Sequence, residues 1–144
     1  MTSPLFSATD RQKDIGLFIL RLVTGVVFTA HGWQKVFGMG VGNIQGFFAK
    51  AGVPVPALVA PLVSYLELVG GIALILGLLT RLVALGFAVD MLGAMFFVHF
   101  AGGFFLPKGY EFVLELCAAA VAFAVAGGGR FSVDHAIATR RSTQ

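Results

Sequence analysis

The chain has 144 residues, and its composition excludes a water-soluble globular domain. Hydrophobic residues make up 58% of it, 19 further residues are glycine, and only 12% are charged, against about 25% in a typical soluble domain. Its mean hydropathy is +0.91, so the polar groups are too few to cover a globule. We therefore expect a lipid bilayer to surround it. The net charge of +3 is spread without a basic stripe, so no nucleic acid is expected as a partner.

Four apolar segments predict an all-α integral membrane protein that folds as a four-helix bundle. They cover about residues 15–37, 57–79, 82–106 and 110–126. The first three are long enough to cross a ~30 Å hydrocarbon core, and the fourth is a little short. The first segment is too long for a signal-peptide core, so we expect it to be retained. Residues 1–14 are predicted to be a polar N-terminal tail and residues 127–144 a cytoplasmic C-terminal tail.

The connections between the segments differ in length. Residues 38–56 are predicted to hold a short interfacial helix, which Pro54 and Pro56 would stop. Thr80 and Arg81 alone are predicted to join the second and third segments. After the third segment, glycines and a proline at 102–107 are expected to break the helix.

Lysine and arginine residues predict that both termini are cytoplasmic. Six of these cations fall on the side of the termini, and three fall on the opposite side. By the positive-inside rule, the richer side faces the cytoplasm. The first group is Arg11, Lys13, Arg81, Arg130, Arg140 and Arg141, and the second is Lys35, Lys50 and Lys108.

Ionisable residues inside the apolar segments are the most informative feature. A charge at the centre of a spanning helix costs about 2.5 to 3.5 kcal/mol, so such residues face the bundle interior and mark functional sites. Arg21 and Asp90 lie at similar depth and are predicted to form a structural ion pair. Asp90 and His99 are nine positions apart and would point to opposite sides of a regular helix, so both could line one pocket only if that helix is broken or kinked.

A second group of charges is predicted to cluster in the outer half of the membrane. His31 and Lys35 share one helix face at i and i+4, and so do Glu111 and Glu115. His99 lies at similar depth, and Glu67 lies below, near the midplane. Glu67 is expected to be protonated, paired with a cation, or part of a proton-relay or ligand site. The simplest single roles for Lys35 and Glu111 are anchors that snorkel to the interface.

The sequence lacks the motifs of several other chemistries. It contains one cysteine, Cys117, and no metal-binding His or Cys spacing. We therefore expect no metal and no covalently bound cofactor. Fifteen phenylalanines provide aromatic walls that suit a flat apolar ligand such as a quinone, although phenylalanine facing lipid needs no ligand to explain it.

Several strings, in this order and spacing, resemble the DoxX family of small bacterial membrane proteins. The resemblance covers about residues 15–135 and implies a multi-pass protein of the bacterial inner membrane. Relatives are described as oxidoreductase components, one branch acting with thiosulfate and quinone and another in oxidative and thiol stress. This chain lacks a cysteine pair, so a mechanism based on its own dithiol is not available to it. The strings are Arg21-Leu22, His31-Gly32-Trp33-Gln34-Lys35, Glu67-Leu68-Val69-Gly70-Gly71, Gly77-Leu78-Leu79-Thr80-Arg81, Val98-His99, Gly109-Tyr110-Glu111 and Gly129-Arg130-Phe131-Ser132-Val133-Asp134.

The leading functional hypothesis is a quinone-reactive or accessory subunit of a membrane oxidoreductase, working with a soluble or peripheral redox enzyme. A small-molecule transporter or permeability factor, and a membrane anchor for soluble redox enzymes, are the alternatives. Whether the chain is catalytic by itself and whether it forms a homo-oligomer are left open. The predicted catalytic residues are His31, Glu67, His99 and Glu115, and the predicted substrate-binding residues are Lys35, Glu111, Trp33 and Tyr110.

Overall fold

The computed structural model describes residues 7–142, in which every regular element is a helix. The predicted tails at 1–14 and 127–144 therefore lie partly outside the described residues. The helices in chain order are α1 (Asp10–Trp33), η1 (Gln34–Met39), α2 (Val41–Lys50), α3 (Pro56–Tyr65), η2 (Leu66–Gly70), α4 (Gly71–Leu76), α5 (Thr80–Ala94), η3 (Met95–His99), η4 (Phe100–Gly102), α6 (Glu111–Ala126) and α7 (Val133–Arg141).

Three continuous helical stretches in the described residues are long and apolar enough to cross a membrane. They are Asp10–Met39, Pro56–Leu76 and Thr80–Gly102. The helix α6 has 16 residues, fewer than these stretches. The first stretch begins at Asp10 rather than near residue 15, because Thr9 and Gln12 form a capping box that starts the helix in the polar segment.

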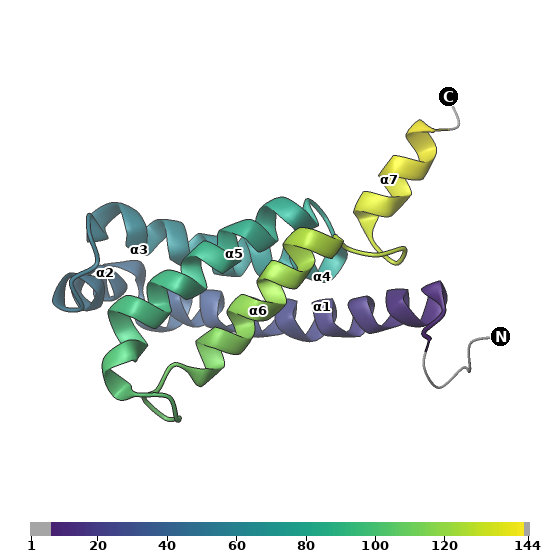
Figure 1. Cartoon of the computed structure of the whole chain (residues 1–144). Coiled ribbons are helices and arrows are strands. Elements are labelled where there is room, and N and C mark those ends of the chain that lie inside the picture. The colour runs from purple at the N-terminus through teal and green to yellow at the C-terminus, as the bar shows by residue number, and fades with distance from the viewer. Residues whose placement is uncertain (1–6, 143–144) are drawn as a thin grey trace.

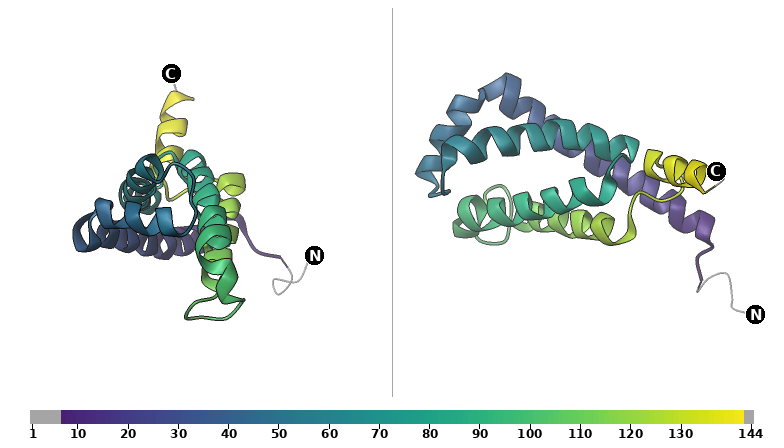
Figure 2. Two further views of the ribbon diagram at one scale, coloured as in Figure 1. Left: turned by 90° about the vertical axis from the view of Figure 1, so that its left-hand side faces the viewer. Right: turned by 90° about the horizontal axis from the view of Figure 1, so that it is seen from above.

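The helices form two hairpins that pack side by side. One hairpin packs α1 on η2 and α4, and the other packs α5 on α6. Both hairpins are visible when the bundle is seen from above (Figure 2). The start of α1 and the helix α7 lie at one end of the bundle, which we call the terminal end, while α2 and the loop between α5 and α6 lie at the other (Figure 1).

The loops differ from the sequence prediction in two details. The predicted short helix is present as α2, but Gly52, with φ of 80°, follows its end, and Pro56 begins α3 instead of stopping α2. Thr80 and Arg81 belong to α5, so the tight connection consists of residues 77–79. Gly77, with φ of 71°, turns the chain there, and an added Cβ would collide with the Arg21 guanidinium.

Glycines let α1 approach η2 and α4 so closely that the backbones touch. A Cβ on Gly32 would collide with the backbone of Leu68, and a Cβ on Gly71 would come within 2.5 Å of the Thr29 nitrogen. A Cβ on Gly25 would lie 2.9 Å from the carbonyl oxygen of Gly71. Small residues at helix interfaces are a general means of close packing in membranes, where apolar side chains gain little by leaving lipid.

Arg21 is buried at the terminal end, but it does not form the predicted ion pair with Asp90. Its Nη1 and Nη2 atoms donate to the carbonyl oxygens of Gly128 and Phe131, both at 2.7 Å. Those carbonyls belong to the glycine-rich loop 127–132 that joins α6 to α7. The prediction was wrong because a buried guanidinium can be satisfied by backbone carbonyls brought in from a distant segment, which helix depth alone does not reveal.

Asp134 fastens the same segment to the start of α5. Its carboxylate accepts hydrogen bonds from the backbone nitrogens of Leu79 and Thr80, both at 2.8 Å. Burial by itself would raise the pKa of the Asp134 carboxyl, but these hydrogen bonds and the charge of Arg21 outweigh burial and lower the pKa. The carboxylate also caps the N-terminus of α5, where a negative charge is favourable.

We expect Gly32→Ala to destabilise the protein by about 1 to 3 kcal/mol, because the added methyl group forces α1 away from η2. The midpoint of thermal unfolding in mild detergent measures the effect. Gly16→Ala is the matched control on α1, since nothing lies within 4 Å of the added atom there, and better helix propensity should leave its stability equal or higher. Equal midpoints for the two variants would contradict the close packing.

The stability difference between the wild type and Asp134→Asn should depend on pH. A lowered pKa in the folded state means that the carboxylate stabilises the fold above the ordinary aspartate range, about pH 4, and that this contribution is lost as pH falls through the folded value. Unfolding followed at pH 7 and at pH 3 should show a large difference at pH 7 and a small one at pH 3. Asp10→Asn, at an exposed site, is the control, and an equal difference at both pH values would refute the assignment.

Candidate functional site

The candidate site is a cavity of about 150 Å³ between the two hairpins, toward the end that carries α2. Four of its lining residues are polar, and the rest of its wall is apolar. A void of this volume is comparable to one that holds a single benzene ring. The lining residues are Phe28, His31, Lys35, Glu67, Met91, Ala94, His99, Leu106, Gly109, Phe112, Val113 and Leu116.

Three of the four polar lining residues lie on π-helical segments. Lys35 lies on η1, Glu67 on η2 and His99 on η3. Such segments are rare and frequently occur at functional sites, because the wider turn changes the direction of the side chains that follow. The sequence predicted that Asp90 and His99 could approach one pocket only if the third helix is broken or kinked. The segment η3 makes this helix irregular between the two residues, and His99 lines the cavity.

Lys35 and Glu67 form an ion pair beside the cavity. The Lys35 ammonium contacts Oε2 of Glu67, and the two side chains are 17% and 4% exposed. Lys35 therefore turns inward instead of snorkelling to the interface. The pair depends on the glycine packing, because Gly32 brings the last turn of α1 against the backbone of Glu67 and Leu68.

Two histidines also line the cavity. The ring of His31 lies 6.3 Å from that of Phe112 on α6. Nδ1 of His99 is 3.4 Å from the carbonyl oxygen of Lys108, a long and weak contact. Both imidazoles therefore keep hydrogen-bonding capacity for a ligand in the cavity.

The other four predicted site residues do not line this cavity. Glu115 is exposed on α6, and Glu111 accepts a hydrogen bond of 2.7 Å from the backbone nitrogen of Leu106. Trp33 is 60% exposed and packs on Phe37. Tyr110 packs against the rings of Phe100 on η4 and Phe104 in the loop that follows. The i and i+4 spacing of Glu111 and Glu115 did place them on one side of α6, but that side is not the one that faces the other hairpin.

Asp90 also lies at this site, although the sequence predicted it to pair with Arg21. Its carboxyl lies beside that of Glu67 and within electrostatic reach of Lys35. Glu67 and Asp90 lie at nearly equal distances along the chain from the turn at 77–79. This equal spacing is the sequence signal that could have predicted their contact.

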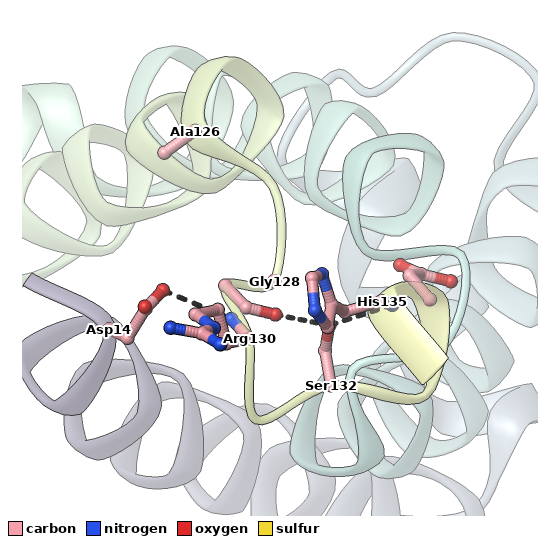
Figure 3. A pocket seen from close by; sticks show the side chains of 8 residues that line it. Asp14, Ala126, Gly128, Arg130, Ser132 and His135 are labelled. Atoms are coloured by element: carbon pink, nitrogen blue, oxygen red, sulfur yellow. Dashed lines mark hydrogen bonds between the residues drawn. The ribbon is translucent and has the colours of Figure 1, made fainter. Parts of the chain in front are cut away.

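A second hollow, of about 360 Å³, lies at the terminal end and has a different character (Figure 3). It is open to the surface and bordered by Asp14, Arg130, His135 and the glycine-rich loop. Its polar groups bond mainly to one another: Asp14 accepts from the backbone nitrogen of Arg130 at 3.0 Å, and Ser132 caps α7 by accepting from that of His135. Its polar contacts are therefore explained by joining the C-terminal segment to α1. In residues 7–142, no group of three or more His, Cys, Asp or Glu side chains could hold a metal.

This fold and site define a small helical membrane protein with an ionisable cluster between two hairpins. The family model described as DoxX matches residues 16–100, and the chain belongs to the DoxX family. It is 35% identical over 107 residues to a Bacillus subtilis protein named "Putative oxidoreductase CatD", covering 74% of this chain and 77% of that one.

Two further relatives cover more of the chain. The inner membrane protein YqjF of Escherichia coli is 31% identical over 130 residues, covering 86% of this chain and 93% of that one. An uncharacterized membrane protein of Mycobacterium tuberculosis is 30% identical over 133 residues, covering 84% and 80%. No solved structure matches the chain significantly. The family and these names support location in a membrane and leave the chemistry of the cavity open.

Removing one partner of the Lys35–Glu67 pair should destabilise the protein more than removing both. Lys35→Met or Glu67→Gln alone leaves a buried group without its partner, at a cost of about 3 to 5 kcal/mol, and the double variant should cost less than the sum of the two. Unfolding of the four proteins in the same detergent measures this coupling. The exposed Lys13–Asp10 pair is the control, with an expected coupling of about 0 to 1 kcal/mol. Strict additivity at Lys35 and Glu67 would contradict a buried pair.

Proposed function

We propose that this protein is a quinone-reactive or accessory subunit of a membrane oxidoreductase, and that it binds a quinone headgroup in the cavity. The observation that carries the proposal is the cavity itself: it has the size of one ring, and four polar side chains line it together with apolar ones. Most ligand sites combine an apolar lining with a few convergent polar groups. The name of the Bacillus subtilis relative supports redox chemistry of some kind.

The residues of the cavity fit a single flat ring. Phe28, Met91 and Phe112 offer apolar and aromatic faces for a ring to pack on. His31 and His99 can donate hydrogen bonds to ring oxygens. The Glu67 carboxyl, held by Lys35, is placed to exchange a proton with one of these oxygens.

A quinone accepts two electrons and two protons when it is reduced to a quinol. In this proposal the electrons come from a reduced soluble or peripheral protein. The chain itself binds and orients the ring, excludes water through the phenylalanine wall, and moves protons at Glu67 and at an imidazole. The reverse direction uses the same residues as proton acceptors.

The proposed membrane arrangement has four crossings and both termini in the cytoplasm. At about 1.5 Å per residue, the 16 residues of α6 extend roughly 24 Å, so a fourth crossing requires local thinning of the bilayer or help from flanking residues. The start of α1 and the helix α7 share one end (Figure 1), as an even number of crossings requires. We place this end on the cytoplasmic side of the bacterial inner membrane because it carries the larger share of lysine and arginine.

An apolar layer favours this proposal over a transport path. The rings of Phe28 and Phe87 stack 3.7 Å apart between the cavity and the terminal end. Phe87, Leu74 and Phe123 are 0% exposed. A transport route would need polar or hydrated groups through this layer, whereas a redox site needs access to the ligand from one side only.

Mass spectrometry of small molecules that co-purify with the protein in mild detergent is the test. We expect the wild type to retain a near-stoichiometric quinone and Glu67→Gln and His31→Ala to lose it at least tenfold. Glu115→Gln and His135→Ala are matched controls, because they change the same residue types outside the cavity, and they should retain it.

The result that overturns the proposal is no quinone in the wild type, combined with no binding of an added short-chain quinone. Uptake assays in vesicles would then test transport. If Glu67→Ala and His31→Ala insert normally and leave the cellular phenotype unchanged, the anchor hypothesis takes its place.

A further inference from the structure

The proposed function gives the Asp90 carboxyl no role. It does not line the cavity; Met91, the next residue, does. Its carboxyl lies beside that of Glu67. Its Oδ2 atom is buried without a hydrogen-bond partner in the described residues. Glu67 is therefore the cavity residue through which Asp90 can exchange a proton with the cavity.

The charges around this pair do not balance if both carboxyls are ionised. Lys35 supplies one positive charge and contacts Glu67 directly. The other titratable groups of the cavity wall are His31 on α1 and His99 on η3, while α6 presents the thiol of Cys117, which donates to the carbonyl oxygen of Ala88. A second buried carboxylate would have no cation of its own, so one proton shared by the two carboxyls is the electrically balanced state.

The proximity of the two carboxyls favours the same state. Two ionised carboxylates only accept hydrogen bonds and repel each other, whereas one protonated carboxyl can donate to its neighbour. The Lys35 ammonium contacts Glu67 and not Asp90, so the shared proton is assigned to Asp90. The apolar layer of Phe28, Phe87 and Leu74 separates this pair from the polar groups of the terminal end, so the proton exchanges toward the cavity.

We propose that Asp90 and Glu67 form a proton-holding pair in which Asp90 stores the proton and Glu67 passes it to the cavity. To deliver the proton, the O–H bond of Asp90 breaks as an O–H bond forms on Glu67, and this Glu67 O–H bond then breaks as one forms on the ligand oxygen, which leaves both carboxyls ionised. No electron moves in this step, and a later proton from the cavity side returns the pair to its first state. The ligand rests on the proposed function, but the shared proton does not.

Infrared spectroscopy of the ligand-free protein tests the pair directly. A protonated carboxyl gives a C=O stretching band that an ionised one lacks. We expect this band at neutral pH in the wild type, and we expect it to shift when the carboxyl carbons of aspartate are labelled with ¹³C. The chain has four aspartates, of which Asp10 is exposed, Asp14 accepts a backbone hydrogen bond and Asp134 has a lowered pKa, so a shifted band belongs to Asp90.

The variants give a second and independent readout. Asp90→Asn should remove the band, and Glu115→Gln should leave it unchanged. If Asp90→Asn does not fold, the labelled wild type alone decides. Absence of the band at neutral pH, a band that shifts only with labelled glutamate, or a band that persists in folded Asp90→Asn would each overturn the proposal. A band present in protein that binds no quinone would leave the proton pair intact and refute only the proposed function.

Discussion

The arrangement of this protein depends on the contact between the backbones of α1 and η2–α4. Glycines 25, 32 and 71 leave no room for a Cβ atom at this contact, so the two helices approach until backbone meets backbone. The approach decides where the polar groups lie, because Gly32 brings the end of α1 against Glu67 and so places Lys35 beside it. Lipid offers no hydrophobic incentive for helices to associate, and close packing must supply the attraction.

The two ends of the bundle handle buried charge in different ways. At the terminal end, Arg21 is satisfied by carbonyls of the glycine-rich loop, and Asp134 by backbone nitrogens at the start of α5. These contacts join distant parts of the chain, while Nε of Arg21 and Oγ1 of Thr80 are buried there without a hydrogen-bond partner among the described residues. At the cavity, Lys35 and Glu67 pair directly while two histidines and Asp90 retain capacity for hydrogen bonds or protons. This difference is the reason to place chemistry at the cavity and a structural role at the terminal end.

Most of the polar residues of the cavity lie on irregular helical segments. Three π-helical segments carry Lys35, Glu67 and His99, and each interrupts a helix that would otherwise be regular. A regular third helix would point Asp90 and His99 to opposite sides. The wider turn of η3 lets one residue contact Glu67 from behind while the other lines the cavity. Segments of this kind are rare and occur frequently at functional sites.

The sequence by itself determined the membrane environment, the apolar helices and the short helix after the first of them, and it singled out Glu67, His31 and His99, which the structure brings to one cavity. These follow from composition, hydropathy and the high cost of burying charge, all of which are local properties. The tertiary structure alone decided the partners: Glu67 rather than the membrane interface for Lys35, loop carbonyls rather than Asp90 for Arg21, and an exposed position for Glu115. Partner choice depends on helix rotation and on segments far apart in the chain, and a single π-helical turn changes that rotation without any clear mark in the sequence.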